Sequence, residues 1–447
     1  MPLALPVAMW AQESPEQRQM VGASDPRAFF PEYYFPALQP VLLASIQDSP
    51  AAIVQGARLE ETDALLDRAR TDYNWHVQAY ARYVGGYEIR EDIDNQTRQY
   101  TYGNVVGRRP LYHWGKIDAR EAQAVAQKTA MTAEVNMELQ NHLLSVREIY
   151  LRALAAQDRK ALADESLRIA NRAVDGVRQL FENGQVSEAQ YLELQVQFQE
   201  AEERVTASER EYTYRLNQLE RALGRDDVAT LLEGVEFPEV EPWTREQLQA
   251  WEQQILAGNL LGDWEQQRYD ALQEQQEKEI FVAKRRYLPD INLEVGINTD
   301  RLDDINNEDS VLRTYGYGGL SLDWMIWDGW RAKADQRIAR SRLLRLDLEE
   351  RMRREENVRQ AKALVEELNF LRLQIDSRER RAQLVHRQLE LDAELGGRSE
   401  MTAQDRLRHQ LSYESLRQDA RDLRINYLLS LARLGLLAFN DPILSDS

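Results

Sequence analysis

The residues of this 447-residue chain that could carry out catalysis or bind a metal ion form no familiar motif. The five histidines are His76, His113, His142, His386 and His409. Their spacing does not match a metal-ligand pattern such as His-Glu-x-x-His. No nucleophile elbow or Walker A sequence occurs, and the glycines of 316–319 are wrongly spaced for a phosphate loop. The sequence therefore predicts a protein that is not an enzyme, with no metal site and no cofactor.

The composition narrows the class of partner. The chain has 56 Lys and Arg against 75 Asp and Glu, a net charge of -19. Nucleic-acid binding needs clustered cations, so we expect no nucleic-acid partner. There is no cysteine, which removes disulfides, thiolate metal sites and cysteine nucleophiles. No window approaches the roughly 18 consecutive apolar residues of a transmembrane helix, and we expect none.

Two segments between Leu288 and Arg331 have the pattern of β-strands in an otherwise helical chain. At about 290–298, apolar residues alternate with polar residues and glycine, which predicts a strand with one apolar face. The next strand, at about 315–327, is rich in aromatic residues that suit a membrane–water boundary. A similar pair is expected at about 75–89 and 99–112.

Helical patterns fill most of the remaining chain. Residues 38–72 are helical with an interruption at Pro50, because proline ends or kinks a helix. Residues 116–223 are helical with one strong break near Gly184, followed by Ser187 as a plausible N-cap. This predicts a helical hairpin whose first arm, at about 65 residues, would be on the order of 100 Å long.

The second half of the chain repeats the first. After its strand pair, a long helix is expected at 331–395, a break at Gly396 and a return helix at 400–437. The two breaks, near Gly184 and Gly396, lie 212 residues apart. The turns before the two long helices are offset by a similar distance, which indicates an internal duplication.

These patterns divide the chain into five parts. They are a signal remnant and extended arm at 1–37, a first repeat at 38–224, a linker at 225–246, a second repeat at 247–437 and a C-terminal tail at 438–447. The N-terminal apolar run has either of two explanations: the end of a truncated secretory signal, or an unordered apolar N-terminus.

The order of these elements resembles the TolC family of outer-membrane efflux proteins, over roughly 38–435. In that family, Leu-Pro precedes the first strand of each half. A hydrophobic-Asp-Gly-Gly-Arg segment leads from the second strand into the long helix. The second half shows Leu288–Pro289 and Trp327–Arg331, with Trp330 in place of the second glycine. The first half departs further, with Asn74–Trp75 for Leu-Pro and His113–Trp114 for Asp-Gly.

The resemblance implies a mainly α fold with a small β part. Each chain would contribute a duplicated helix, strand pair and long helical hairpin to a trimeric α-barrel tunnel, continuous with a 12-stranded outer-membrane β-barrel. The implied function is the outer-membrane channel-tunnel of a tripartite efflux or type I secretion system, a passive conduit for small molecules or proteins. The implied partners are two further copies of the chain, a periplasmic adaptor, an inner-membrane transporter and outer-membrane lipid. The location would be the outer membrane of a Gram-negative bacterium, with a periplasmic helical extension.

The resemblance also suggests roles for individual residues. Arg398, Thr402 and Asp405 correspond to the family's tunnel constriction, with Thr402 in place of the first of two Asp residues. The tips that would meet an adaptor contain Gly184, Gln185, Gly396 and Gly397. Nine aromatic residues would mark the membrane interfaces: Tyr100, Tyr102, Tyr112, Trp114, Tyr315, Tyr317, Trp324, Trp327 and Trp330.

A second class of function stays open. The apolar residues of the long helices are spaced by three and four, as in Leu364, Leu368, Leu371 and Ile375, which is typical of coiled coils. A soluble periplasmic or cytoplasmic coiled-coil scaffold would show the same seam.

Overall fold

A computed structural model describes residues 25–89, 96–235, 237, 240–258, 261–303, 310–395 and 403–445. The chain separates into two compact units. The first comprises residues 1–57, 134–266 and 352–447, and the second comprises residues 58–133 and 267–351. Each unit therefore contains segments of both sequence halves.

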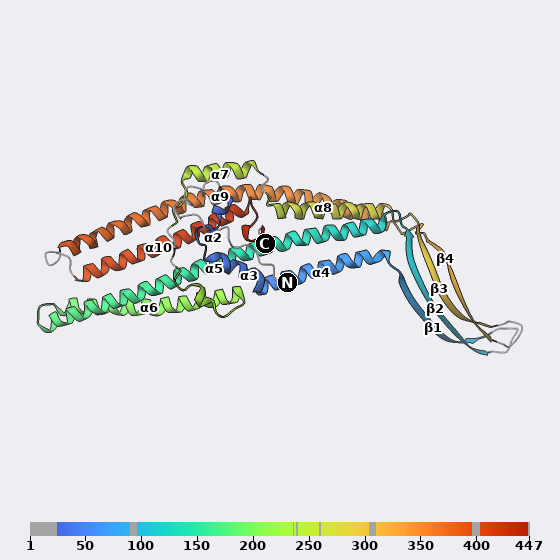
Figure 1. Ribbon diagram of the computed structural model, residues 1–447, viewed down its shortest axis with the longest axis horizontal. Coiled ribbons are helices and arrows are strands. Elements are labelled where there is room, and N and C mark those ends of the chain that lie inside the picture. The colour runs from blue at the N-terminus through green and yellow to red at the C-terminus, as the bar shows by residue number, and fades with distance from the viewer. Residues whose placement is uncertain are drawn as a thin grey trace. The chain divides into compact units, whose positions relative to one another are not determined.

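The order of the elements follows the duplication (Figure 1). In chain order they are η2 (Pro26–Phe29), α2 (Pro31–Tyr34), α3 (Leu38–Asp48), α4 (Pro50–Arg70), η3 (Thr71–Tyr73), β1 (His76–Glu88), β2 (Gln96–Tyr112), α5 (Lys116–Glu182), α6 (Glu188–Leu223), η4 (Val228–Leu231), α7 (Arg245–Ala257), α8 (Asp263–Lys284), β3 (Asp290–Asp303), β4 (Ser310–Asp323), α9 (Arg331–Leu395), α10 (Ala403–Leu436) and α11 (Pro442–Ser445). Helix, strand pair, long helix and return helix occur twice, as α4 to α6 and as α8 to α10. The predicted fold class, mainly α with a small duplicated β part, is confirmed.

In the second unit the four strands form one antiparallel sheet in the order β1-β2-β3-β4. The two halves meet at its centre, where β2 pairs with β3 from Tyr102↔Asp300 to Tyr112↔Ile291. The fourth strand ends at Asp323, four residues earlier than expected. Trp324 follows the last paired residue, and its indole Nε1 donates to the Tyr287 carbonyl at 2.8 Å.

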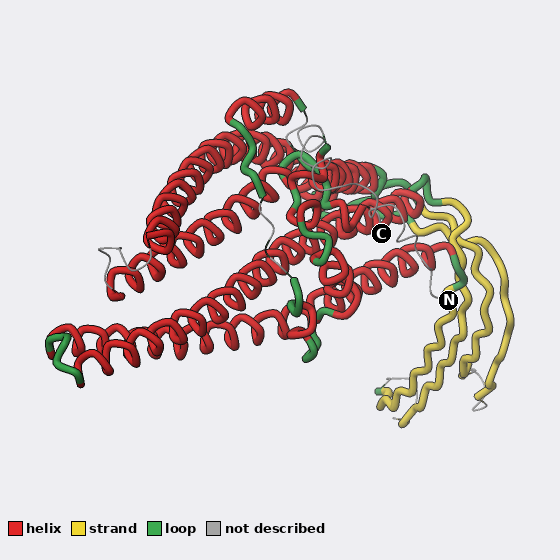
Figure 2. Tube along the Cα trace, turned by 60° about the vertical axis from the view of Figure 1, so that its left-hand side comes forward, coloured by secondary structure: helices red, strands yellow, loops and turns green. Residues whose placement is uncertain are grey.

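In the first unit the long helices lie in one layer. Figure 1 and Figure 2 both show the order α9, α10, α5, α6 within this unit. Ion pairs join the neighbours: Arg424 to Glu379 at 2.5 Å between α10 and α9, and Arg421 to Asp158 at 2.6 Å between α10 and α5. Lys160 and Glu209 join α5 to α6 at 3.0 Å. The two outer members of the layer are therefore α9 and α6.

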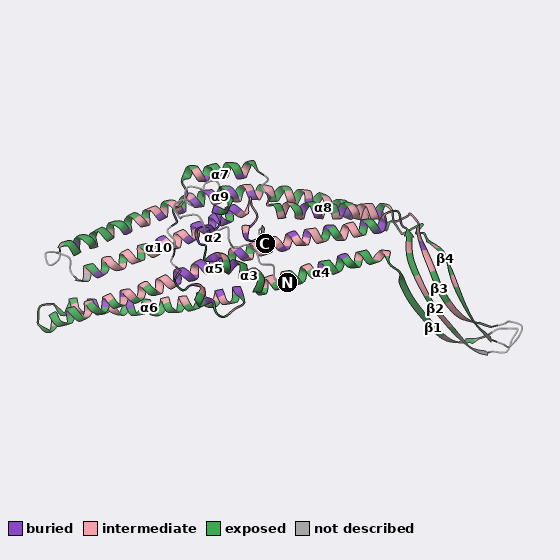
Figure 3. Cartoon of the chain, viewed as in Figure 1, coloured by how far each residue is buried: buried purple, intermediate pink, exposed green. Residues whose placement is uncertain are grey.

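The N-terminal segment differs from the extended arm expected up to residue 37. From Pro26 it forms η2 and α2, and Phe29 and Phe30 are buried in the core of the first unit. The C-terminal tail also folds: Asp441, just before α11, and Ile443, within it, are buried. Figure 3 shows buried residues gathered around α2 and along α10 and α5, while the hairpin end of α5 and α6 is largely exposed. The sequence did not predict these helices, because each is too short to show a period.

Candidate channel-forming site

The turns that lead from the sheet into the two long helices use different residues for the same task. In the first half, His113 Nδ1 accepts the backbone N–H of Ile117 at 3.1 Å, which caps α5. In the second half, Asp328 Oδ2 accepts the N–H of Ala332 at 2.8 Å, which caps α9. Both acceptors lie four residues before the donor. His113 therefore takes the place of the family's Asp, so this departure preserves the cap.

The same turns share an unusual backbone. Trp114 and Gly115 have φ of 58° and 74°, and Gly329 and Trp330 have φ of 65° and 69°. Each turn thus contains two consecutive left-handed residues, one glycine and one tryptophan in opposite order. Glycine adopts this region freely, whereas a tryptophan there is strained. The glycine of the family pattern and Trp330 therefore occupy the same backbone conformation.

Side chains fix these turns to the chain that enters β3. The indole Nε1 of Trp114 donates to the Pro289 carbonyl at 2.8 Å. Lys116 Nζ donates to the Leu288 carbonyl at 3.0 Å and pairs with Asp290 at 2.6 Å. The Leu-Pro segment is thus the acceptor that positions the first long helix.

Five of the aromatic residues predicted at the membrane interface gather at this end of the sheet and are exposed. They are Tyr112, Trp114, Trp324, Trp327 and Trp330, between 39% and 59% exposed. Tyr112 packs edge-on against Trp114, and Trp327 against Trp330, with centroids 4.9 and 4.8 Å apart. Their position stays compatible with an aromatic girdle.

Three other aromatic residues predicted at the membrane interface lie on the polar face of the sheet. Tyr315 and Tyr317 pair with Asn298 and Gly296, on the face opposite Leu320 and Leu322. The Tyr315 hydroxyl accepts from Asn298 at 2.8 Å, and the Tyr317 hydroxyl donates to Glu294 at 3.1 Å.

Tyr102 belongs to the same polar face, where its hydroxyl accepts from Asn104 at 3.1 Å. These three tyrosines therefore face the polar side of the sheet, and their role at the membrane interface stays a prediction. The side chain of Tyr100 lies outside the described residues. Two aromatic residues that were not among the predicted interface residues, Tyr83 and Tyr87, share the exposed apolar face with Val77. Their odd-numbered alternation with Val77 was the available signal.

The polar face of the sheet carries a network of charges. Arg108 of β2 reaches Glu294 of β3 at 3.0 Å and Asp323 of β4 at 3.6 Å. Asn292, nearly buried, donates to Asp323 at 2.8 Å. The opposite face exposes aliphatic residues such as Val295 and Leu320. The sheet therefore separates an apolar environment from a polar one.

The first tip has the predicted turn. Gly184 has φ of 70°, and the N–H groups of Gly184 and Gln185 donate to the Phe181 and Leu180 carbonyls, both at 2.9 Å. Ser187 forms a capping box at the start of α6, as its sequence position predicts. A Cβ on Gly184 would meet nothing within 4 Å, so the glycine is required by φ alone.

The second tip is described only in part. Gly396, Gly397, Arg398 and Thr402 lie outside the described residues. Asp405 stands in the first turn of α10 and pairs with Arg408 of its own helix at 3.6 Å.

Two arginines of α10 bind carboxylates of other helices near the tips, one in the other hairpin and one in its own. Arg408 reaches Glu193 of α6 at 3.6 Å. Arg406 reaches Asp392 of α9 at 2.5 Å, and the Asp392 side chain is only 3% exposed. Sequence reasoning missed this buried carboxylate.

A buried ionic cluster holds the middle of α5 and was also missed. Arg147 is fully buried and donates to Glu32 through Nε at 2.9 Å and to Asp441 through Nη1 at 2.5 Å. The arginine stands within the apolar stripe that contains Leu143 and Tyr150, and that was the one local signal. Burial raises the pKa of Glu32, and the Asp441 carboxylate adds to this effect. Burial alone would lower the pKa of Arg147, but the two carboxylates raise it, so the guanidinium stays charged.

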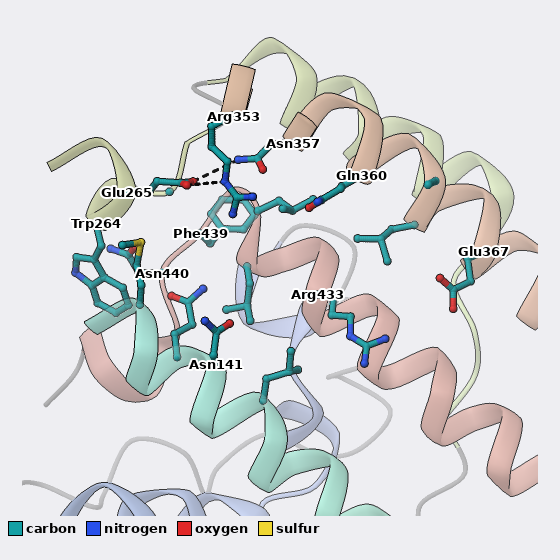
Figure 4. Close-up of a pocket in the computed structure, with 18 residues that line it drawn as sticks. Asn141, Trp264, Glu265, Arg353, Asn357, Gln360, Glu367, Arg433, Phe439 and Asn440 are labelled. Carbon is teal, nitrogen blue, oxygen red and sulfur yellow. Dashed lines mark hydrogen bonds and ion pairs between the residues drawn. The ribbon is translucent and has the colours of Figure 1, made fainter. Parts of the chain in front are cut away.

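A cavity of about 480 Å³ lies between α5, α8, α9 and the end of α10 in the first unit (Figure 4). Trp264 and Phe439 line it together with Asn141, and the pair Arg353–Glu265, at 2.7 Å, spans one wall. None of the predicted site residues lines this cavity. Across the described part of the chain, no group of three His, Cys, Asp or Glu could hold a metal ion. Nor is any helix in that part sufficiently long and apolar to span a membrane.

These features define a mainly helical class of protein, in which two equivalent halves supply one sheet with an apolar and a polar face. Residues 46–225 match the family model described as outer membrane efflux protein. The resemblance to outer-membrane efflux proteins is thus confirmed for that segment. The match supports the role that the resemblance implies, the channel-tunnel of a tripartite efflux system.

Solved structures agree with the fold along nearly the whole chain. The outer membrane protein VceC from Vibrio cholerae is 15% identical, with a TM-score of 0.65 over 90% of this chain and 97% of that one. The CmeC outer membrane channel of Campylobacter jejuni is 12% identical, with a TM-score of 0.68 over 92% and 88%. The open state of the MtrE outer membrane channel of Neisseria gonorrhoeae is 14% identical, with a TM-score of 0.66 over 90% and 89%. No curated protein matches the chain.

Proposed function

We propose that three copies of this chain form a passive export channel in the outer membrane of a Gram-negative bacterium, with the helices extending into the periplasm. The observation that carries this proposal is the four-stranded sheet, with an exposed apolar face and a hydrogen-bonded polar face. The family match of residues 46–225 supports it.

The unpaired edges of the sheet favour association with further copies of the chain. Within the described chain, β1 and β4 each pair with one strand only. In lipid, an unpaired edge leaves backbone donors and acceptors without partners, which costs several kcal/mol per group. Three copies would pair every edge and close 12 strands. The apolar face, with Val77, Val295 and Leu320, would then meet lipid, and Arg108 and Glu294 would line the channel.

The proposal assigns the energy of transport to other proteins. An inner-membrane transporter would drive export, and a periplasmic adaptor would contact the tips at Gly184 and Gln185 and at Gly396 and Gly397. We propose no enzymatic activity for the chain itself. Purified protein that hydrolysed a nucleotide in proportion to its concentration would contradict this part.

Asp405 is the residue we propose at the constriction. Three Asp405 carboxylates around one axis would attract cations, and Arg408, at 3.6 Å, would reduce their mutual repulsion. Replacing Asp405 with Ala should raise single-channel conductance or weaken cation preference in planar bilayers. Unchanged conductance and selectivity would remove Asp405 from the constriction.

Fractionation tests the proposal as a whole. The chain is expressed with a full signal sequence, and we expect it in the outer-membrane fraction, as a species of three chains in mild detergent. Recovery in the soluble fraction would favour the coiled-coil scaffold instead. The chain is then expressed in a bacterial strain that lacks its own channel. Drug efflux and protein secretion are measured separately in that strain, which shows which class of substrate the chain exports.

A further inference from the structure

Four tyrosines gather on the polar face of the sheet: Tyr80, Tyr102, Tyr315 and Tyr317. Directly paired residues of an antiparallel sheet point to the same side, and so do residues two apart along a strand. The register places Tyr80 and Tyr315 in one row across all four strands. Tyr102 lies in the next row on one side of it, and Tyr317 lies in the next row on the other side. We name these four residues the tyrosine collar.

The collar spans the full width of the sheet. Tyr80 belongs to the edge strand β1, Tyr102 to β2, and the other two tyrosines to the second edge strand, β4. The remaining strand, β3, has Gly296 opposite Tyr317, and a Cβ on Gly296 would lie 2.7 Å from Cζ of the Tyr317 ring. The Tyr317 ring therefore lies across β3, in space that a side chain at position 296 would fill. Every strand thus carries a tyrosine ring or lies beneath one.

Contacts on the same face hold the collar rings in place. The ring centroids of Tyr80 and Tyr102 are 6.0 Å apart, and those of Tyr315 and Tyr317 are 6.3 Å apart. The hydroxyls of Tyr102, Tyr315 and Tyr317 each make one of the hydrogen bonds described above. Tyr80 and Tyr315 nevertheless stay 55% and 39% exposed. The collar is therefore a fixed surface that presents aromatic rings to the polar side of the sheet.

The Tyr315 ring already receives one planar group. The guanidinium carbon of Arg313 lies 4.7 Å from the ring centroid, and Arg313 also pairs with Asp300 at 3.6 Å. The second carboxylate beside the collar, Glu294, pairs with Arg108 at 3.0 Å. Arginines thus neutralise both carboxylates, and the groups that a solute meets on the collar are the rings. This chemistry favours an uncharged planar ring over an aromatic cation.

We propose that the tyrosine collar is a stacking site for uncharged planar aromatic molecules on the inner wall of the channel. The inference rests on the proposed function, in which the polar face lines the channel. Three copies related by rotation place their collars at one height, and each copy contributes four rings to that level. Repeated stacking slows a flat aromatic solute more than a solute of similar size without an aromatic face. Tyr102, Tyr315 and Tyr317 then act inside the channel.

The current through single channels in planar bilayers tests the collar, with caffeine as the probe. Caffeine is a flat, uncharged aromatic molecule, and glucose serves as an uncharged ring without an aromatic face. At equal concentrations, caffeine should lower the conductance of the natural chain more than glucose does. Tyr80→Leu combined with Tyr315→Leu removes the two exposed rings and should remove more than half of this difference. Tyr80→Phe combined with Tyr315→Phe keeps the ring faces and should keep the difference.

The matched control is Tyr83→Leu combined with Tyr87→Leu. Both tyrosines belong to β1 and are 65% and 64% exposed, but they lie on the apolar face of the sheet. This variant should keep the full difference between caffeine and glucose. A loss as large as that of the collar variant would overturn the inference, because it would not depend on the face that carries the rings.

The outcomes separate this inference from the proposed function. A channel whose current falls equally in caffeine and in glucose would overturn the collar and leave the channel proposal standing. If the unmodified chain forms no channel in bilayers, both fail. Where the double leucine variant does not insert, Tyr80→Leu alone provides the readout, since this ring is more than half exposed and lies on an edge strand. It should reduce the caffeine effect, and an unchanged effect would contradict the inference.

Discussion

The two long helices, α5 with 67 residues and α9 with 65, begin in the same way but are held differently at mid-length. Both follow a turn with two left-handed residues and a capping side chain. Further along, α5 is fixed by the buried pairs of Arg147, whereas α9 lies at the outside of its layer with exposed apolar residues. The two halves have therefore kept the same helix start. The contacts at the middle of each long helix differ, because the two helices occupy different positions in the fold.

The largest effect should come from breaking the feature that only α5 has. Replacing Arg147 with Met leaves Glu32 and Asp441 buried without their cation, so the free energy of unfolding should fall by about 3–5 kcal/mol. Denaturant unfolding in detergent measures this. The control is Arg152→Met, which removes a partly exposed pair with Glu148 and should cost below about 1 kcal/mol. Equal losses would mean that the cluster does not hold α5.

A second variant tests the cap of α9. Asp328 lies outside the strands, and the Tyr287 hydroxyl, the Ala332 N–H and Arg286 hold the pKa of its carboxyl below the usual 3.8. A carboxyl whose pKa is lower in the folded than in the unfolded protein stabilises the fold at pH values above its unfolded-state pKa. This stabilisation is lost as the pH falls through its folded-state pKa. Asp328→Ala should therefore lower the thermal midpoint at pH 7, and the difference from the natural chain should shrink below about pH 4.

The control for this cap is Asp335→Ala, which removes the other carboxylate partner of Arg286 without touching the cap. A midpoint difference that stays constant with pH would show that the charge of Asp328 does not stabilise the helix start.

A third comparison concerns the strained tryptophans. Trp330→Ala removes the ring but keeps a Cβ at φ of 69°, whereas Trp330→Gly removes both. The glycine variant should be more stable than the alanine variant by roughly 1–2 kcal/mol, because the left-handed strain is relieved. The same pair of variants at Trp114 should give the same difference. A clearly smaller value at one turn would show that the two backbones are not equivalent.

The smallest effect is expected at the first tip. Gly184→Ala should cost about 1 kcal/mol, since alanine is disfavoured at φ of 70°. Gly176 lies within α5 with open space around its Cα, so Gly176→Ala should instead stabilise by about 1 kcal/mol. We expect the thermal midpoint of Gly184→Ala to lie below that of the natural chain, and the midpoint of Gly176→Ala to lie above it. A shift in the same direction would contradict it.

Local patterns predicted much of this fold. The hairpin turn at Gly184, the cap at Ser187 and the start of α9 at Arg331 were all readable, because each depends on the conformation of a few adjacent residues. The alternation of β4 also places Tyr315 and Tyr317 on the face opposite Leu320 and Leu322, but which residues of β3 they meet depends on the register between the two strands.

Contacts between segments far apart in the chain could hardly be predicted from the sequence. Glu32 and Arg147 are 115 residues apart, and Arg147 and Asp441 are 294 apart, with no period or motif joining them. The cluster was therefore invisible until α2, α5 and the C-terminal segment came together.

The sequence by itself determined the duplicated order of helices and strands, since periodicity, turn residues and caps act within a few positions of the chain. Tertiary structure decided the rest. It determined which residues of β3 the tyrosines of β4 meet, which arginine is buried with two carboxylates, and which two helices lie outermost. These depend on the register and packing of segments far apart in the chain, and a one-dimensional pattern does not contain them.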